Sequence, residues 1–506
     1  MKLGALAAAA GLAIKANGDT NADADAPYAA ANVTGFAIDH RKVAPGTVFG
    51  AFPGTRFNGE DFIEAAIASG AIAVVARAQA GVTGAAHIAD PEPRRAFARL
   101  AARFFQPVPE TVVAVTGTNG KTSCVELTRQ LWRMAGHRAA SIGTLGVTTA
   151  DESVSTGLTT PDIVTFLANM TGLAREGVTH VAYEASSHGL SQFRNEGLRV
   201  CAGAFTNLSR DHLDYHDTMD AYFAAKMRLF DEVVESGGPE GGWAVVWADD
   251  AWSAKAFEHV RQRGLRLLDV GEQADGDDRG IRLLARTPGQ LGQTLEIRHQ
   301  GKNHRIMLPL IGAYQAANAL VSAGLVIASG GDAGETFAAQ TFADLARLQP
   351  VRGRLERAAI TRSGAPVYVD YAHTPDALEA AIAALRPHAK GRLITVFGAG
   401  GDRDEGKRPE MGRAVCSGSD VAFVTDDNPR GERADLIRAA ILAGCEGARE
   451  IGDRREAIRT AMAEAGAGDL VLIAGKGHEQ GQIVGRGENM RVLPFDDVAV
   501  ARECVA

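Results

Sequence analysis

The chain has 506 residues, of which 46% are hydrophobic and 23% are charged, and its formal net charge is −8. A chain of this length is expected to form about three domains, each with an ordinary hydrophobic core. The negative charge and the lack of a basic run argue against a nucleic-acid surface and favour a soluble protein. No stretch is long and apolar enough to predict a membrane-spanning helix.

The first 18 residues, MKLGALAAAAGLAIKANG, contain a short apolar run that is also typical of a signal peptide. The run is rich in alanine and only weakly hydrophobic, so we interpret it as a first helix capped by Asn17-Gly18. The phosphate-binding loop described below supports this interpretation, because such a loop implies cytosolic ATP and a cytoplasmic protein.

Residues 1–106 are predicted to form a small α/β domain that is followed by a linker. The two prolines in the segment 106–109 would break the last helix and mark that linker. The predicted elements are a turn at 43–46, strands at 47–52 and 71–76, and helices at 62–69 and 94–105.

The segment 112–122, VVAVTGTNGKT, predicts a buried strand, a tight glycine turn and then a helix. Gly117 and Gly120 would let the turn point its N–H groups at phosphate oxygens. Lys121 would add a positive charge, and the Thr122 hydroxyl would reach a bound Mg²⁺. The longer GxxxxGK[ST] pattern is incomplete, because a valine occupies its first glycine position. The alternative interpretation is a purely structural turn.

Residues 107–347 alternate between strand and helix patterns, which predicts a parallel, doubly wound sheet. The predicted elements are strands at 111–116, 179–183 and 200–206, helices at 219–232 and 310–329, and a hairpin at 289–306.

Polar side chains follow two of these strands. Glu184 and His188 follow one strand, and Asp211 and His212 follow the next. Because ligands bind at the carboxyl ends of parallel strands, this arrangement predicts a site there. The alternative is a set of exposed loop charges with hydrogen-bonded histidines. Lys226 lies among apolar residues of the following helix, where spacing alone favours a side chain that reaches solvent.

Residues 348–506 again show a strand–helix–strand pattern. The glycine turn at 398–401 follows a strand, but no suitably placed acid follows it, so it only weakly indicates a dinucleotide site. The charged residues after the turn are interpreted as a solvated loop. The predicted elements are strands at 367–371, 393–397, 421–425 and 470–473, and helices at 377–385 and 434–444.

The five cysteines lie far apart and form no CxxC pair, so we expect reduced, buried thiols in a reducing compartment. They are Cys124, Cys201, Cys416, Cys445 and Cys504.

A series of motifs along nearly the whole chain resembles the Mur ligases, the ATP-dependent amide-bond ligases of peptidoglycan synthesis. Their order and spacing are those of the family, which is more specific than any single loop. The matching stretches are DHRKVAPGTVFGA, TGTNGKTS, GLTTPD, EASSHGLSQFR, FTNLSRDHLDYH, AAKMRLF, GRLE, DYAHTPDALE, GAGGDRDEGKRP, DDNPR and AGKGHE.

The resemblance implies an α/β fold with three domains. Residues 1–106 would bind the UDP-linked substrate, and residues 107–347 would form a central P-loop ATPase with a parallel sheet. Residues 348–506 would form a Rossmann-like domain that closes over ATP, brings the amino acid and excludes water.

The resemblance also implies the catalytic residues, which are Lys121, Glu184, His212 and Lys226. Lys226 carries a carbamate in the family, which turns a cation into an anionic oxygen ligand suited to Mg²⁺. The implied metal ligands are Thr122, Glu184, His212 and Lys226. The implied ATP contacts are Gly117, Thr118, Asn119, Gly120, Lys121, Thr122, Ser123, Asn318, Arg354, Asp370 and His373.

Two further sets of contacts follow from the same resemblance. Those to the UDP-linked substrate are Ile38, His40, Thr159, Thr160, Ser186, Gln192 and Arg194. Those to the incoming amino acid are Arg403, Asp427, Asn428, Pro429, Arg430, Gly475 and Glu479. The arginine of DDNPR suits meso-diaminopimelate, because a guanidinium can pair bidentately with its distal carboxylate.

The sequence departs from the family at a few positions. His40 stands where the family usually has serine, which leaves the uridine contacts open. Trp247 and Gln315 stand where asparagine is common, which leaves the adenine contacts open, and Ala399 replaces a frequent cysteine.

The expected reaction is the addition of meso-diaminopimelate to UDP-N-acetylmuramoyl-L-alanyl-D-glutamate through an acyl phosphate. ATP is a substrate, and Mg²⁺ and the Lys226 carbamate assist. We expect a monomer without nucleic-acid or membrane partners. The alternatives are the same reaction with L-lysine, a ligase similar to folylpolyglutamate synthetase, and a catalytically silent relative that only binds a ligand.

Overall fold

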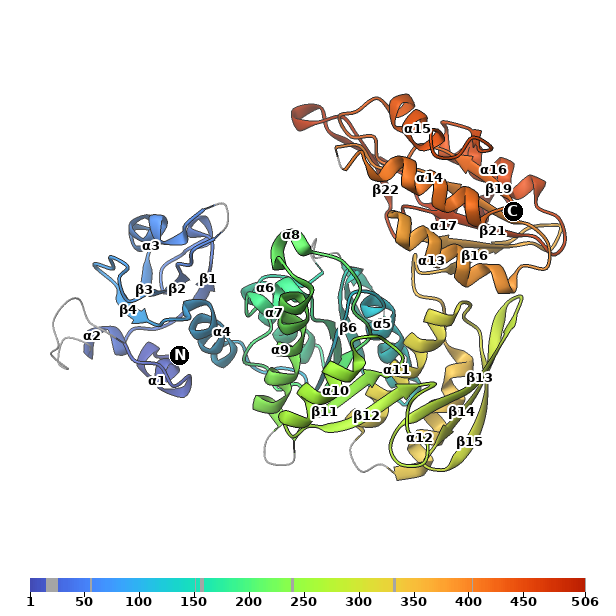
Figure 1. Ribbon diagram of the computed structural model, residues 1–506. Coiled ribbons are helices and arrows are strands. Elements are labelled where there is room, and N and C mark those ends of the chain that lie inside the picture. The colour runs from blue at the N-terminus through green and yellow to red at the C-terminus, as the bar shows by residue number, and fades with distance from the viewer. Residues whose placement is uncertain are drawn as a thin grey trace. The chain divides into compact units, whose positions relative to one another are not determined.

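The computed structural model describes residues 1–14, 26–54, 57–150, 152–154, 159–237, 241–330, 334–402 and 404–505. The fold is mixed α/β and divides into two compact units (Figure 1). The first is Met1–Leu268 with Leu325–Gly331, and the second is Asp269–Gly324 with Asp332–Ala506. Within the described ranges, every helix is too short or too polar to cross a membrane.

The first unit begins with a parallel sheet in the order β1-β2-β3-β4. Phe97 of α4 packs edge-on against Phe36 and Phe52, so this helix covers one face of the sheet. The strands are β1 (Gly35–Ala37), β2 (Thr47–Gly50), β3 (Ala71–Ala76) and β4 (Ala86–Ala89). The helices are α1 (Leu3–Ala9), α2 (Ala26–Ala29), η2 (His40–Lys42), η3 (Gly59–Phe62), α3 (Ile63–Ala68) and α4 (Pro93–Phe104).

The predicted first helix exists, but its predicted end is wrong. The C-cap of α1 is Ala10, and the chain turns at Gly11, whose φ is +68°. The Asn17-Gly18 pair lies outside the described residues. Glycine at the turn relieves the backbone strain of a positive φ, so the helix ends earlier than the alanine run suggests.

The larger sheet of the first unit has the order β11-β10-β5-β9-β6-β7-β8. The strands from β11 to β6 are parallel, which confirms the predicted parallel sheet, whereas β7 and β8 add an antiparallel edge. The strands are β5 (Thr111–Thr116), β6 (Ala139–Gly143), β7 (Gly146–Thr148), β8 (Ser153–Val154), β9 (His180–Glu184), β10 (Ala202–Phe205) and β11 (Trp243–Trp247). The helices are α5 (Lys121–Met134), α6 (Ile163–Arg175), α7 (Ser187–Ser191), α8 (Leu213–His216), α9 (Met219–Gly237) and α10 (Ser253–Gln262).

The second unit starts with strands β12 to β15, and β12 begins at the end of the first unit. The predicted hairpin is confirmed, since β14 and β15 pair antiparallel around Gln300-Gly301. The strands are β12 (Arg266–Gly271), β13 (Ile281–Gly289), β14 (Gly292–His299) and β15 (Lys302–Leu308). The helices that follow are α11 (Ala313–Ser329), α12 (Gly334–Asp344) and η5 (Leu345–Arg347).

The last sheet has the order β16-β17-β21-β18-β19-β20 and is parallel except at β16. Its buried residues form one core with α13, α14 and α15 and another with α16 and α17, so helices cover both faces. The strands are β16 (Glu356–Ile360), β17 (Pro366–Asp370), β18 (Leu393–Phe397), β19 (Val421–Val424), β20 (Arg449–Glu450) and β21 (Leu470–Ala474), with a separate antiparallel pair β22 (Gly481–Val484) and β23 (Arg491–Pro494). The helices are α13 (Pro375–Leu385), η6 (Arg386–His388), α14 (Lys407–Gly418), α15 (Ala434–Leu442), α16 (Arg454–Glu464), η7 (Gly487–Asn489) and α17 (Asp497–Glu503).

A disulfide joins Cys416 of α14 to Cys445 beyond α15, with the Cα atoms 5.6 Å apart. The prediction of reduced thiols is therefore wrong for these two residues. They are 29 positions apart in sequence, and only the packing of α14 against α15 brings them together. Cys124, Cys201 and Cys504 are free thiols, as expected, but of the three only Cys124 is buried and the other two are half-buried.

Candidate active site

The glycine turn after β5 is held open by the neighbouring strand end. The N–H groups of Thr118 and Asn119 donate to the main-chain and side-chain oxygens of Asn207, each at 2.9 Å. Gly117 has a φ of +144°, and a Cβ there would overlap the Thr206 hydroxyl. Only glycine fits this position, and α5 begins at once after the turn. Asn207 thus fixes the shape of the turn, and the start of α5 is the part that suits an anion, because the first N–H groups of a helix have no partner within it.

Two lysines converge on this turn. The Lys121 ammonium donates to the Gly117 and Thr118 carbonyl oxygens at 3.0 and 2.8 Å, and the Lys226 ammonium donates to the Gly117 oxygen at 2.7 Å. Lys226 is only 1% exposed, so the simple expectation of a solvent-reaching side chain is wrong. Its amine faces inward, where it lies 4.3 Å from the Tyr222 ring. Burial lowers the pKa of Lys226 well below its usual value, and the Lys121 charge lowers it further.

Glu184 ends β9, the strand beside β5, and is 2% exposed. Its carboxylate accepts from the Thr144 N–H at 2.7 Å and from the Thr144 hydroxyl at 3.3 Å. A Cβ at Gly143 would overlap this carboxylate, so the glycine at the end of β6 makes room for it. Glu184 is therefore a buried, oriented carboxylate at the carboxyl end of its strand, which is the same end of the sheet as the glycine turn.

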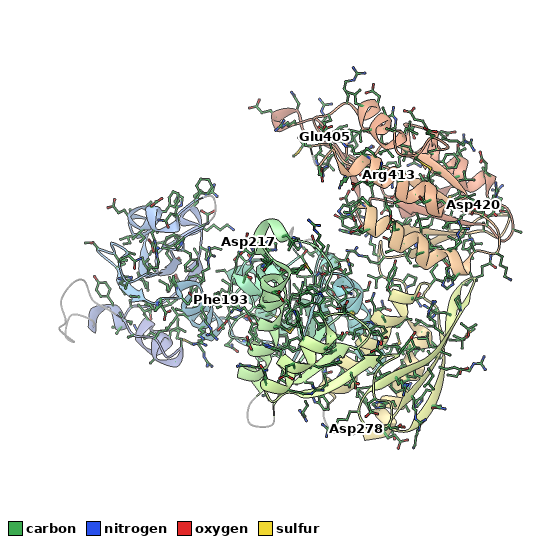
Figure 2. All side chains as sticks on the ribbon, in the orientation of Figure 1. Phe193, Asp217, Asp278, Glu405, Arg413 and Asp420 are labelled. Atoms are coloured by element: carbon green, nitrogen blue, oxygen red, sulfur yellow. A yellow bond between two sulfur atoms is a disulfide. The ribbon has the colours of Figure 1, made fainter. Side chains whose placement is uncertain are left out.

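The segment after β10 carries His212, which has a left-handed backbone with a φ of +52°. The backbone is also left-handed at Phe193 and Asp217, at the ends of the neighbouring short helices (Figure 2). The His212 ring lies 4.9 Å from the His188 ring and 6.1 Å from the Tyr222 ring. Tyr222 in turn lies 3.3 Å from the Thr118 hydroxyl, so these rings line one side of the turn.

The residues expected to bind the UDP-linked substrate form a connected network, except at the N-terminal positions. Thr160 donates to the Ser186 hydroxyl at 2.9 Å, and Arg194 donates to the Thr160 carbonyl at 2.8 Å and to Gln192 at 2.7 Å. Thr159 reaches the same network through Thr144, at 3.2 Å. Burial lowers the pKa of the Arg194 guanidinium.

His40 and Ile38 lie in the N-terminal sheet region of the first unit. The His40 ring stacks on Phe62 with centroids 4.4 Å apart and planes 3° apart, and Ile38 is exposed. Asp39 accepts from the Arg41 backbone and side chain, which lowers the pKa of Asp39 to about 2. The residue that replaces serine thus presents a stacked ring rather than a hydroxyl.

The expected nucleotide contacts of the second unit also lie together. The Asp370 carboxylate at the end of β17 accepts from the Leu355 and Ala372 N–H groups at 2.7 and 2.8 Å, and burial raises its pKa although Arg354 opposes that shift. The Arg354 guanidinium and the His373 ring both contact Tyr371. In α11, Asn318 donates to Gln315 at 3.2 Å, and Gln315 donates to the Arg354 carbonyl at 2.8 Å. Gln315, which replaces the family's asparagine, therefore binds the backbone of the loop that carries Arg354.

The residues expected to bind the amino acid also come together, on the loops after β19 and β21. Asn428 donates to Glu479 at 2.8 Å, and a Cβ at Gly475 would lie 2.6 Å from the Asp427 carboxylate. Pro429 is buried between them, and Arg430, with a φ of +51°, donates to the Gly401 carbonyl at 3.0 Å. The predicted Arg403 lies outside the described residues.

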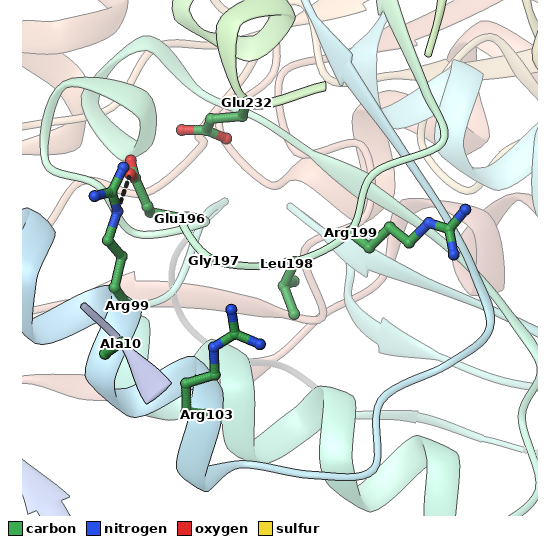
Figure 3. A pocket seen from close by; sticks show the side chains of 8 residues that line it. All are labelled: Ala10, Arg99, Arg103, Glu196, Gly197, Leu198, Arg199 and Glu232. Carbon is green, nitrogen blue, oxygen red and sulfur yellow. Dashed lines mark hydrogen bonds and ion pairs between the residues drawn. The ribbon is translucent and has the colours of Figure 1, made fainter. Parts of the chain in front are cut away.

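A cavity of about 390 Å³ in the first unit holds none of the predicted site residues (Figure 3). It lies beside the amino-terminal end of β10, whereas the glycine turn lies at the carboxyl-terminal end of the neighbouring strand β5. The buried Glu196 in its wall pairs with Arg95, Arg99 and Arg228, which ties α4 to the larger sheet. The lining residues are Ala10, Arg99, Arg103, Glu196, Gly197, Leu198, Arg199 and Glu232. We interpret this cavity as part of a structural joint.

Three residues of these regions were missed at the sequence level. Thr144 holds Glu184, and a threonine after a glycine at a strand end could have indicated this. Tyr222 covers Lys226 and contacts the turn. Lys476 lies in the AGKGHE motif and is 0% exposed, which is unusual for a lysine.

A glycine turn with two lysines beside a buried carboxylate at the next strand end, as found in the first unit, is typical of α/β enzymes that bind a nucleotide phosphate. Comparisons with known families specify this class. The Mur ligase family catalytic domain matches residues 32–110, the Mur ligase middle domain matches 115–326, and the Mur ligase glutamate ligase domain matches 353–477. The chain belongs to the Mur ligase family.

Two relatives support this assignment over nearly the whole chain. The UDP-N-acetylmuramoyl-L-alanyl-D-glutamate--2,6-diaminopimelate ligase of Zymomonas mobilis is 58% identical over 504 residues, covering 100% of this chain and 99% of that protein. The ligase of the same name from Bradyrhizobium diazoefficiens is 53% identical over 469 residues, covering 93% and 94%.

Solved structures agree at the level of the fold. A ligase structure of the same name is 33% identical, has a TM-score of 0.71 and covers 94% of each chain. A Mycobacterium tuberculosis folylpolyglutamate synthase complexed with ADP is 20% identical with a TM-score of 0.59, covering 76% of this chain and 92% of that one. The second likeness concerns the fold alone.

Proposed function

We propose that the chain adds meso-2,6-diaminopimelate to the D-glutamate of UDP-N-acetylmuramoyl-L-alanyl-D-glutamate in peptidoglycan synthesis, converting ATP to ADP and phosphate. The relatives at 58% and 53% identity are named for this reaction. The observation that carries the chemistry is the glycine turn after β5, where Lys121 and the buried Lys226 share one carbonyl acceptor. A turn with this charge suits the phosphates of ATP.

The reaction needs ATP because a carboxylate is a poor electrophile. Transfer of the γ-phosphoryl group to the γ-carboxylate of D-glutamate makes one of its oxygens part of a phosphate leaving group. The amine of diaminopimelate then attacks the carbonyl carbon, and phosphate leaves. The N–H groups at the start of α5 and the Lys121 ammonium would bind the ATP phosphates and offset the negative charge that gathers during transfer.

The donor groups around the turn fit Mg²⁺. They are the Thr122 hydroxyl, the buried Glu184 carboxylate and the His212 imidazole. Within the described part of the chain, no cluster of three or more His, Cys, Asp or Glu residues forms a metal site by itself. Mg²⁺ usually takes few protein ligands and completes its shell with phosphate oxygens and water. When bound, Mg²⁺ would withdraw negative charge from the transferring phosphoryl group.

A carbamate on Lys226 belongs to the same proposal. An amine must be unprotonated to add to CO₂, and the lowered pKa of this buried lysine favours the unprotonated form. The carbamate would replace a buried cation by an anionic oxygen ligand for the metal.

We further propose that Arg430 selects the amino acid. The distal carboxylate of diaminopimelate would pair with its guanidinium, and the carboxylates of Asp427 and Glu479 would accept the distal ammonium. L-Lysine lacks the distal carboxylate and would leave the Arg430 charge unpaired.

The domain boundaries remain those predicted from the sequence: 1–106 for the UDP-linked substrate, 107–347 for ATP and 348–506 for the amino acid. The use of ATP and of a UDP-linked substrate supports a cytoplasmic enzyme, and the monomeric state stays a prediction.

The test is phosphate release by the purified chain with ATP, Mg²⁺ and UDP-N-acetylmuramoyl-L-alanyl-D-glutamate, with diaminopimelate or L-lysine as the acceptor. We expect release and tripeptide formation with diaminopimelate, and at least about tenfold lower kcat/KM with lysine. Equal use of both amino acids would contradict the proposed substrate.

A further inference from the structure

The loops that would bind the amino acid are built around one buried lysine, Lys476. Its side chain is 0% exposed, and an ammonium is expensive to bury unless it is paired and hydrogen-bonded. Lys476 follows Gly475, at the point where β21 ends and the second of the two loops begins. The burial of the Lys476 ammonium beside a binding site therefore indicates a role for its charge.

The Lys476 ammonium makes its contacts within the protein. It donates to the Asn428 side-chain oxygen at 2.8 Å and to the Gly481 carbonyl at 2.9 Å. The carboxylates of Asp427 and Glu479 lie 3.4 and 3.6 Å away, at ion-pair distance. Two of its three N–H donors are thus in hydrogen bonds, and the side chain is fully buried. Lys476 therefore does not contact the substrate itself.

The lysine fixes the orientation of the Asn428 amide. Its oxygen accepts from Lys476 and from the Ile483 N–H at 2.9 Å, so its NH₂ group faces away from the lysine. That NH₂ group donates to Glu479 at 2.8 Å. The chain of contacts thus runs from Lys476 through Asn428 to the half-buried carboxylate of Glu479.

A second cation nearby does not replace Lys476. The buried Arg454 interacts electrostatically with Asp427 and Glu479, but its guanidinium pairs with Asp497 at 2.7 and 2.8 Å and donates to the Ala474 carbonyl at 3.0 Å. Its charge is balanced by Asp497, whereas that of Lys476 is balanced by the two carboxylates of the loops.

We propose that Lys476 is a positioning residue for the incoming amino acid, which holds Asp427 directly and Glu479 through Asn428, so that the two carboxylates accept an ammonium group at the end of the substrate distant from the reacting amine. This inference rests on the proposed function and deepens it. The negative groups held by Lys476 and the positive Arg430 together match a distal centre that carries both an ammonium and a carboxylate.

The experiment compares two acceptors, diaminopimelate and 2-aminopimelate, which keeps the reacting amine and both carboxylates but lacks the distal ammonium. In the wild-type chain, kcat/KM should favour diaminopimelate. In Lys476→Met, the ratio of kcat/KM for diaminopimelate to that for 2-aminopimelate should fall by about tenfold, because only diaminopimelate has a distal ammonium whose binding is weakened. Lys476→Arg should restore part of this ratio. In both variants the KM for ATP should stay within about twofold of the wild-type value.

A matched control is Arg392→Met, which removes a pair with Asp469 at the other ends of β18 and β21. It should lower stability and leave the preference unchanged. If Lys476→Met does not fold, the ratio is measured in Lys476→Gln, which keeps donors but no charge. An equal loss for both acceptors, or an unchanged preference, would overturn the role of Lys476. Inactive wild-type protein would instead count against the proposed function.

Discussion

Two glycine turns follow buried parallel strands in this protein, and they differ in what comes next. After β5, α5 starts at Lys121, so the turn and the helix start face the same space. After β18, residues 398–401 lead into a loop, and α14 starts only at Lys407. The Gly401 N–H donates to the Asn428 carbonyl at 2.9 Å, and a Cβ at Gly401 would overlap the Pro429 oxygen. The first turn lies directly beside a helix start, which is a favourable place for an anion, whereas the second packs against the loop after β19.

The position of the next helix thus decides whether a glycine turn suits phosphate binding or only close packing. N–H groups bind phosphate when a helix start adds its own unpaired donors beside them. Where the helix starts later, the same residue type only allows close packing. The prediction that the second turn is weak evidence for a dinucleotide site agrees with this packing.

The largest effect is expected from Lys226→Ala. If the first turn works through a modified lysine, this change should lower kcat by more than about a hundredfold, because it removes a charge that acts in the transition state. Added short carboxylates should restore part of the activity. The control is Lys255→Ala, since Lys255 is exposed, pairs with Asp220 and lies over the Trp252 ring. Full activity of Lys226→Ala would contradict the carbamate.

Replacing one glycine of each turn by alanine should separate the ATP-binding role of the first turn from the amino-acid-binding role that the second turn supports. Gly117→Ala should raise the KM for ATP by about tenfold or more, because Gly117 has a positive φ and no space for a Cβ. Gly401→Ala should instead raise the KM for the amino acid, with the KM for ATP unchanged. Steady-state kinetics with each substrate varied would measure both values. A rise in the KM for ATP from both variants would remove the distinction between the turns.

A smaller effect is expected from Arg430→Lys, on the loop that the second turn supports. A lysine cannot offer two parallel donors to a carboxylate, so kcat/KM for diaminopimelate should fall by about tenfold. The value for L-lysine as acceptor should change little. Competition between the two amino acids, with the products separated by mass, gives the ratio. An unchanged ratio would show that Arg430 does not read the distal carboxylate.

The sequence predicted several strands well. The bounds of β3, β5 and β18 agree with the predicted ranges to the residue, because each is a short run of apolar and β-branched residues. The strand-end positions of Glu184 and the turn also followed from the pattern. These features depend on residues that are neighbours in the chain.

Features that join distant residues were not predictable in the same way. The Cys416–Cys445 disulfide depends on how α14 packs against α15, and no local spacing indicates it. The contact between Thr144 and Glu184 depends on the pairing of β6 with β9. The burial of Lys226 and Lys476 was missed because spacing on a helix or loop does not tell which neighbour covers a long side chain.

The smallest effect concerns the larger sheet of the first unit, at the end of its parallel strands that lies opposite the first turn. Burial lowers the pKa of His180, at the start of β9, from 6.5 to about 4, and the stacked His137 ring adds to this. Between these values the unfolded chain binds a proton that the folded chain does not. The free energy of unfolding should therefore fall as the pH falls from 6.5 towards 4.

Urea unfolding at several pH values would measure this dependence in the wild type and in His180→Gln. The variant should show a shallower loss of stability over the same range, with unchanged kinetics for ATP at neutral pH. Equal slopes in both proteins would mean that His180 does not cause the dependence.

The central claim is that the D-glutamate carboxylate is activated by a phosphoryl group bound at the first turn. The most direct measurement uses UDP-N-acetylmuramoyl-L-alanyl-D-glutamate with ¹⁸O in its γ-carboxylate, together with ATP and diaminopimelate. If an acyl phosphate forms, one ¹⁸O atom should appear in each phosphate released, because the bridging oxygen of the acyl phosphate leaves with the phosphorus. Phosphate released without ¹⁸O, while the amide still forms, would contradict it.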